Sequence, residues 1–171
     1  ADLLGTGIEI GVDEGLFADS LLSVWIGKKL YGVDPYISMP ASEWRDGQMF
    51  NQDRTETLKR AKTLLEKFGD RHQFILDYSQ NTAHTFEDSS LDFVYIDANH
   101  SYAHVTQDIG LWWPKVKPGG VLGGHDFYYR NTASQFCNVP TAVGEFCQQN
   151  NLFEHITSCK SWWVQKPLQT P

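Results

Sequence analysis

Two stretches of this chain each have the pattern of a buried strand that ends in polar residues. They cover residues 92–100 (DFVYIDANH) and residues 118–126 (PGGVLGGHD). In an open parallel sheet, ligands bind at the carboxyl ends of the strands. If these two strands are neighbours, their polar ends form one site. The side chains expected there are Asp97, His100, His125 and Asp126.

Apolar strand-like segments alternate with segments of helical spacing along most of the chain. The expected strands are 7–11, 30–34, 72–76, 92–96, 120–124, 152–157 and 161–165. The expected helices are 16–26, 53–68, 102–116 and 141–150, with a long loop at 35–52. This alternation predicts an α/β fold, a doubly wound and mostly parallel sheet. The last two strands predict an antiparallel hairpin at its edge.

Length and composition limit the kind of protein this can be. A chain of 171 residues predicts one domain over residues 1–171, and 41% hydrophobic residues can supply its core. The net charge is -7 and no stretch is rich in Lys or Arg, which argues against nucleic acid as the partner. Apolar runs such as Leu21–Ile26 are far too short to span a membrane. Oligomeric state cannot be read from these features.

The three cysteines lie in the last quarter of the chain and none forms a C-x-x-C pair. This spacing indicates neither a zinc site nor a redox motif. Free thiols are typical of a reducing compartment, and the start of the chain lacks the pattern of a signal peptide. We therefore expect a cytoplasmic protein.

A turn with two glycines follows the first expected strand. Gly11 and Gly15 permit a tight strand-to-helix turn and a close approach of the backbone to a ligand. Asp34 ends the second expected strand, nineteen residues after Gly15. A carboxylate at that place can accept hydrogen bonds from both hydroxyls of a ribose, as in NAD-binding enzymes. The turn lacks their G-x-G-x-x-G pattern, which makes a nicotinamide cofactor the weaker alternative.

Five segments together resemble the class I S-adenosylmethionine-dependent methyltransferases. The resemblance runs from about residue 7 to about residue 165. The I-D-x-x-H-S-Y and G-G-x-x-x-x-H-D elements are similar to those of sugar O-methyltransferases and, more distantly, of metal-dependent catechol methyltransferases. The segments that carry the resemblance are residues 9–15, Asp34, residues 77–79, residues 96–102 and residues 117–126.

The resemblance implies an S-adenosylmethionine-dependent O-methyltransferase with a small hydroxylated acceptor, such as a sugar. Glu9 and Asp13 would suit the ammonium group of the cofactor, Asp34 its ribose, and residues 77–79 its adenine. The full set of cofactor-binding residues implied in this way is Glu9, Gly11, Asp13, Gly15, Asp34, Asp77, Tyr78, Ser79 and Asp97.

For catalysis we expect His100 to act as general base, because an imidazole has a pKa of about 6.5. Asp97 could bind metal, orient the substrate or cap the next helix. Asp97, His125 and Asp126 could hold Mg²⁺ or Mn²⁺. A metal-free site, with His125 and Asp126 binding substrate hydroxyls, remains open. So does a metal held by His100 and His104, four residues apart on one helix face.

The chain departs from the family pattern in three ways. Residues 9–15 correspond to the first motif of the family, and Asp13 stands where that motif usually has its middle glycine. Phe127 follows Asp126 where the catechol-type enzymes have Asn. The helices that often precede the first strand and cap the cofactor are missing. The short N-terminus and Asp13 leave open a non-catalytic module that binds a cofactor or partner, and Asp34 leaves open an NAD-dependent oxidoreductase.

Overall fold

The computed structural model describes residues 3–37, 54–128 and 138–168. Within these residues the apolar segments form one seven-stranded sheet. Its strands are β1 (Thr6–Ile10), β2 (Lys29–Val33), β3 (His72–Ile75), β4 (Leu91–Ile96), β5 (Val116–Gly124), β6 (His155–Ile156) and β7 (Trp162–Gln165).

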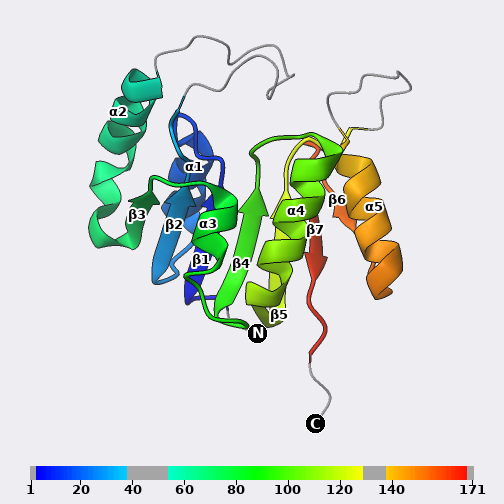
Figure 1. The fold of residues 1–171 in the computed structure, drawn as a ribbon. Coiled ribbons are helices and arrows are strands. Elements are labelled where there is room, and N and C mark those ends of the chain that lie inside the picture. Colours follow the sequence, from blue (N-terminus) through cyan, green and yellow to red (C-terminus); the bar gives the residue numbers. More distant parts are fainter. Residues whose placement is uncertain (1–2, 38–53, 129–137, 169–171) are drawn as a thin grey trace.

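The sheet has the strand order β3-β2-β1-β4-β5-β7-β6 (Figure 1). Strands β1 to β5 pair in parallel, whereas β7 pairs antiparallel with both β5 and β6. This confirms the predicted mostly parallel sheet and its C-terminal antiparallel hairpin. Because β1 lies between β2 and β4, the direction of winding reverses beside β1, which is where open sheets of this kind bind ligands.

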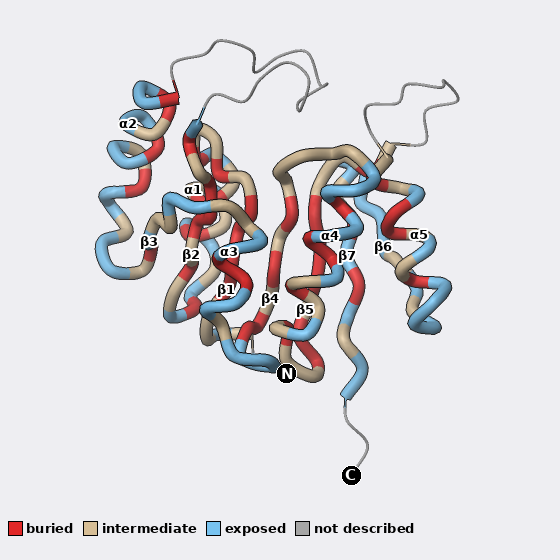
Figure 2. Tube along the Cα trace, in the orientation of Figure 1, coloured by how far each residue is buried: buried red, intermediate tan, exposed pale blue. Residues whose placement is uncertain are grey.

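Helices cover both faces of the sheet. They are α1 (Leu16–Val24), α2 (Arg54–Leu65), α3 (Ser79–Ala83), α4 (Tyr102–Trp112) and α5 (Val139–Asn150), with 3₁₀ turns at Glu66–Arg71 and Trp113–Lys115. Residues of α3, α4 and α5 join the main apolar core, whereas α1 and α2 form a second cluster around Leu30. The buried stretches in Figure 2 accordingly follow the strands and the inner faces of the helices.

The bounds of all four predicted helices differ from those observed, and two differ most. The helix expected to end at residue 68 is α-helical only to Leu65 and continues as a 3₁₀ turn. The helix expected to end at residue 116 leaves the α conformation at Trp112, two residues before Pro114. A proline lacks the N–H that an α-helix needs, so this early end has a direct cause.

Three further elements were not predicted correctly. The strand expected at 152–157 is limited to His155–Ile156. Strand β5 begins at Val116 instead of 120, because the Pro-Gly-Gly segment forms a bulge within the strand. Leu91 of β4 pairs with Val116 and Phe93 pairs with Val121, so the bulge places extra residues on β5 alone. Helix α3 was missed because five residues are too few to show a helical period.

Some expectations fall where the structure describes little or nothing. Most of the expected loop at 35–52 lies outside the described residues, as does Cys137. Cys147 and Cys159 are free thiols. Among the described residues, each helix is too short or too polar to cross a membrane.

Candidate cofactor and catalytic site

Backbone hydrogen bonds continue the sheet past the ends of its central strands. The N–H of Gly11 donates to the carbonyl of Val33 at 2.9 Å, and the N–H of Asp97 donates to Ile10 at 2.7 Å. The N–H of His125 donates to Ile96 at 3.1 Å. These bonds hold the segments after β1, β4 and β5 side by side at the carboxyl edge, the upper edge of the sheet in Figure 1. The first motif and the two predicted polar ends therefore share one edge.

Three of the predicted polar side chains form a cluster at this edge. The Nε2 atom of His100 lies 3.3 Å from Oδ1 of Asp97, and its Nδ1 atom lies 3.2 Å from Oδ2 of Asp126. All three side chains are partly buried, and that of His100 is only 16% exposed. A carboxylate therefore lies beside each ring nitrogen of His100, and the two carboxylates together fix the orientation of the ring.

His125 lies beside this cluster and is not a member of it. Its Nδ1 atom lies 3.0 Å from Oδ1 of Asp126, and its Nε2 atom is 3.1 Å from the carbonyl oxygen of Cys159. His104 is also separate, because its Nδ1 atom bonds the hydroxyl of Ser101 at 2.7 Å on the exposed side of α4. Among the described residues, the group of side chains close enough to share a metal ion includes neither His125 nor His104.

The cluster has a donor set that fits a divalent cation. One atom each of Asp97, His100 and Asp126 lies within 4.8 Å of the others among the described residues. Carboxylate oxygens suit Mg²⁺, and an imidazole in the set shifts the preference toward Mn²⁺ or Zn²⁺. The two predicted carboxylates are thus brought together, with His100 in the place that the sequence assigned to His125.

Glu9 is buried beneath the turn after β1. Glu9 is only 1% exposed, and its Oε2 atom has no hydrogen-bond partner among the described residues. Burial, reinforced by the nearby charges of Asp97 and Asp34, raises the pKa of Glu9 well above its usual value. A buried carboxyl oxygen without a partner is costly unless a ligand supplies one. The assignment of Glu9 to the ammonium group of the cofactor stays a prediction, and a ligand that supplies this missing partner would be consistent with it.

The two glycines of the first motif occupy backbone conformations that other residues rarely adopt. Gly11 has a φ of 86°, and a Cβ atom there would lie 2.2 Å from the carbonyl oxygen of Asp97. Gly15 has a φ of 81° and precedes α1, where a Cβ atom would lie 3.0 Å from Leu65. Gly11 thus allows the first turn to pass directly against the segment after β4, which brings the cofactor motif and the cluster together.

Asp34 accepts three backbone hydrogen bonds at the end of β2. Its Oδ2 atom accepts from the N–H groups of Val12 and Asp13, both at 3.1 Å, and its Oδ1 atom accepts from Tyr36 at 2.8 Å. A carboxylate offers about four lone-pair positions. By this count a position at Oδ1 is left for a hydrogen bond from a ligand, and the assignment of Asp34 to the two ribose hydroxyls stays a prediction.

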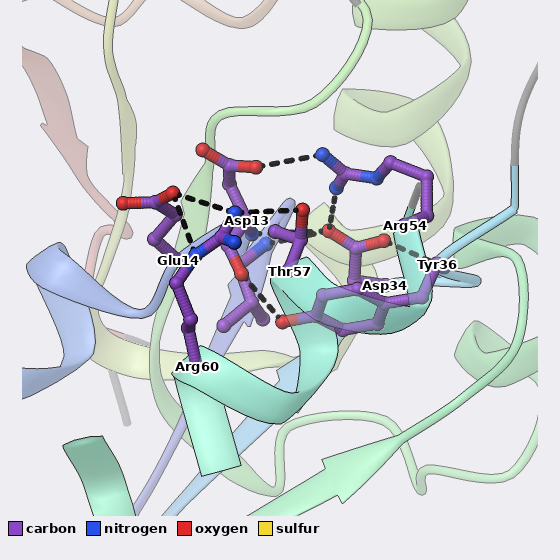
Figure 3. Close-up of polar contacts among 8 residues, drawn as sticks. Asp13, Glu14, Asp34, Tyr36, Arg54, Thr57 and Arg60 are labelled. Carbon is purple, nitrogen blue, oxygen red and sulfur yellow. Dashed lines mark hydrogen bonds and ion pairs between the residues drawn. The ribbon is translucent and has the colours of Figure 1, made fainter. Parts of the chain in front are cut away.

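A cation that the sequence reasoning missed lies next to this carboxylate. Figure 3 shows the guanidinium of Arg54 between Asp13 and Asp34. Its Nη1 atom is 2.7 Å from Oδ1 of Asp13, and its Nη2 atom is 3.6 Å from Oδ2 of Asp34. The sequence held one signal: Arg54 opens a helix, where the helix dipole disfavours a positive charge unless something else holds it.

The segment predicted to hold adenine begins α3. Asp77 accepts hydrogen bonds from the N–H of Tyr78 at 2.7 Å and from the side chain of Asn81 at 2.9 Å. The hydroxyl of Ser79 donates to Asp108 of α4 and accepts from the indole of Trp112 at 2.8 Å. The Ser79 side chain therefore joins α3 to α4, and the role of residues 77–79 in adenine binding stays a prediction.

Comparisons with known proteins bear on the family and the fold of the chain. A family model described as a methyltransferase domain matches residues 8–127, more than half of the chain. A search of curated proteins gives no match.

Solved structures of low sequence identity share the fold. The O-methyltransferase TomG from Streptomyces achromogenes, in complex with SAM, is 12% identical with a TM-score of 0.63, over 96% of this chain and 73% of that one. An rRNA methylase from Streptococcus thermophilus is 15% identical with a TM-score of 0.63, over 98% and 89%. A SAM-dependent O-methyltransferase from Thermotoga maritima is 14% identical with a TM-score of 0.60, over 97% and 60%.

Proposed function

The chain belongs to the methyltransferase family whose model it matches and is an S-adenosylmethionine-dependent methyltransferase, and on this premise we propose that it methylates a hydroxyl oxygen of a small acceptor, such as a sugar. The observation that carries the proposal is the position of His100 between Asp97 and Asp126. Family membership also removes the NAD-dependent oxidoreductase from the alternatives.

The residues of the chain would prepare the acceptor oxygen. When bound, S-adenosylmethionine supplies a methyl group on a sulfonium, which an oxygen nucleophile can attack in line. Asp126, 3.2 Å from Nδ1 of His100, would accept the N–H at that atom and leave Nε2 as the basic nitrogen. Nε2 would then take the hydroxyl proton as the new oxygen–carbon bond forms.

Most of the rate would come from holding the acceptor oxygen close to the methyl group and aligned with it. Asp97 and Asp126 would hold Mg²⁺ or Mn²⁺, and such a cation would lower the pKa of the acceptor hydroxyl and fix its oxygen. His100 cannot serve as base and metal ligand through the same nitrogen. Its role as base therefore assigns the metal to the two carboxylates.

The test is an acceptor screen that measures formation of S-adenosylhomocysteine, starting from sugars and phenols. On an accepted substrate, we expect His100→Ala to lower kcat by about 100-fold or more. His104→Ala is the matched control, because His104 is an exposed histidine on α4 outside the cluster. Full activity of the His100 variant would exclude His100 as the general base. Full activity of metal-free protein in chelator would exclude a role for the metal in the reaction.

A further inference from the structure

The turn after β1, residues 11–15, is held by groups that follow it in the chain by twenty or more residues. We call this segment the first turn. Asp34 accepts the N–H groups of Val12 and Asp13, and the hydroxyl of Tyr36 donates to the carbonyl oxygen of Asp13 at 2.7 Å. The end of β2 therefore fixes one side of the first turn.

Arg54 fixes the other side from α2. It is only 7% exposed, and its two ion pairs reach the carboxylates of Asp13 and Asp34. The guanidinium carbon also lies 5.5 Å from the centre of the Tyr36 ring. A planar guanidinium can bridge two carboxylates and lie against an aromatic ring at once, which a lysine ammonium cannot do. Figure 3 shows these contacts converging on the first turn.

The backbone of Asp13 explains why its side chain needs this partner. Asp13 has a φ of 47°, in the left-handed region that favours glycine and that aspartate adopts at some cost. It stands where the first motif usually has a glycine. Its side chain is 48% exposed, yet one oxygen is bound by Arg54. The ion pair thus offsets a backbone conformation that glycine would adopt freely.

Arg54 also balances charge at this end of the site. Asp13 and Asp34 approach each other through the first turn, and Asp34 in turn acts on the buried carboxyl of Glu9. Carboxylates this close repel one another when nothing neutralises them. Removing Arg54 would leave this repulsion to act on the turn that approaches the cofactor.

We infer that Arg54 is a positioning residue for S-adenosylmethionine, because it holds Asp13, Asp34 and the first turn in the arrangement that accepts the cofactor. The inference rests on the proposed function. It explains how a chain with Asp13 in place of the usual glycine keeps a working first motif. It also assigns α2 a part in cofactor binding without direct contact to the reacting atoms.

Calorimetric titration with S-adenosylhomocysteine tests the inference. We expect Arg54→Met to weaken binding by about 10-fold or more, since a small misplacement of binding groups has effects of up to about 100-fold. Arg54→Lys should restore only part of the affinity. Arg60→Met is the matched control, because Arg60 pairs with Glu14 of the same turn at 2.9 Å but is exposed. Its affinity should stay within about twofold of the unchanged protein.

Two further measurements separate positioning from a loss of folding. A positioning role raises KM for S-adenosylmethionine and leaves kcat and KM for the acceptor nearly unchanged. A merely structural role lowers the fraction of active protein, and so the apparent kcat, with both KM values unchanged. Should Arg54→Met fail to fold, Arg54→Lys keeps the positive charge but cannot bridge the carboxylates of Asp13 and Asp34 as the guanidinium does. Weaker binding by that variant supports the inference, and unchanged binding overturns it.

The outcomes also separate this inference from the function on which it rests. If the unchanged protein does not bind S-adenosylhomocysteine, the proposed function fails and the inference fails with it. If it binds but the Arg54 variants bind equally well, only the positioning role is overturned. Equal losses of affinity in Arg54→Met and Arg60→Met would also overturn it. They would show that any ion pair between α2 and the first turn has the same effect on binding.

Discussion

Asp108 provides a quantitative prediction about the segment that joins α3 to α4. It is only 5% exposed, and burial raises its pKa from 3.8 to about 6 even though the hydroxyl of Ser79 donates to it. Because the folded protein binds this proton more tightly than the unfolded chain does, the free energy of unfolding decreases as pH rises from 3.8 through 6. The full penalty above pH 6 is about 3 kcal/mol, at about 1.4 kcal/mol per pKa unit.

Asp108→Asn removes this titration and keeps an oxygen that can accept from Ser79. Between about pH 4.5 and about pH 7.5, the unchanged protein should lose about 2 kcal/mol of unfolding free energy relative to the variant, since part of the penalty is already present at the lower pH. Urea unfolding of both proteins at the two pH values measures this difference.

The comparison cancels other effects of the substitution, because these act equally at both pH values. A difference between the two proteins that does not change with pH would refute the reasoning. It would mean that Asp108 has an ordinary pKa in the folded protein. The prediction concerns stability, and it needs no assumption about the acceptor or the metal.

Three further predictions concern residues of β1 and β3 and of the first turn. Burial lowers the pKa of His72 to about 4, so the free energy of unfolding decreases as pH falls below 6.5. Between about pH 7 and about pH 5, the unchanged protein should lose about 2 kcal/mol more unfolding free energy than His72→Phe, as measured by urea unfolding. Gly11→Ala should cost about 2 kcal/mol or more and weaken S-adenosylhomocysteine binding, because of its positive φ and the contact with Asp97; unchanged stability would contradict this. Glu9→Gln should raise the Tm of the ligand-free protein at neutral pH, where burial disfavours the carboxylate, and lower cofactor affinity in calorimetry. A lower Tm would count against that account of Glu9.

Local patterns were enough to predict that two carboxylates gather at one edge of the sheet. Asp97 and Asp126 each follow an apolar run, and parallel pairing of β4 and β5 brings them to one edge. The choice between His100 and His125 was not local. His125 contacts the carbonyl of Cys159, in the connection between β6 and β7, and this long-range contact holds its ring beside the cluster.

The sequence by itself determined the order of the strands and of every helix except α3, the glycine turn after β1 and the edge at which the polar residues gather. These features depend on side-chain period and on backbone preferences, which act over a few residues. Only the tertiary structure decided that Arg54 of α2 lies between Asp13 and Asp34 and that Asp34 has one acceptor position left. An ion pair forms where two packed elements bring charges together, and neither residue's local sequence specifies its partner.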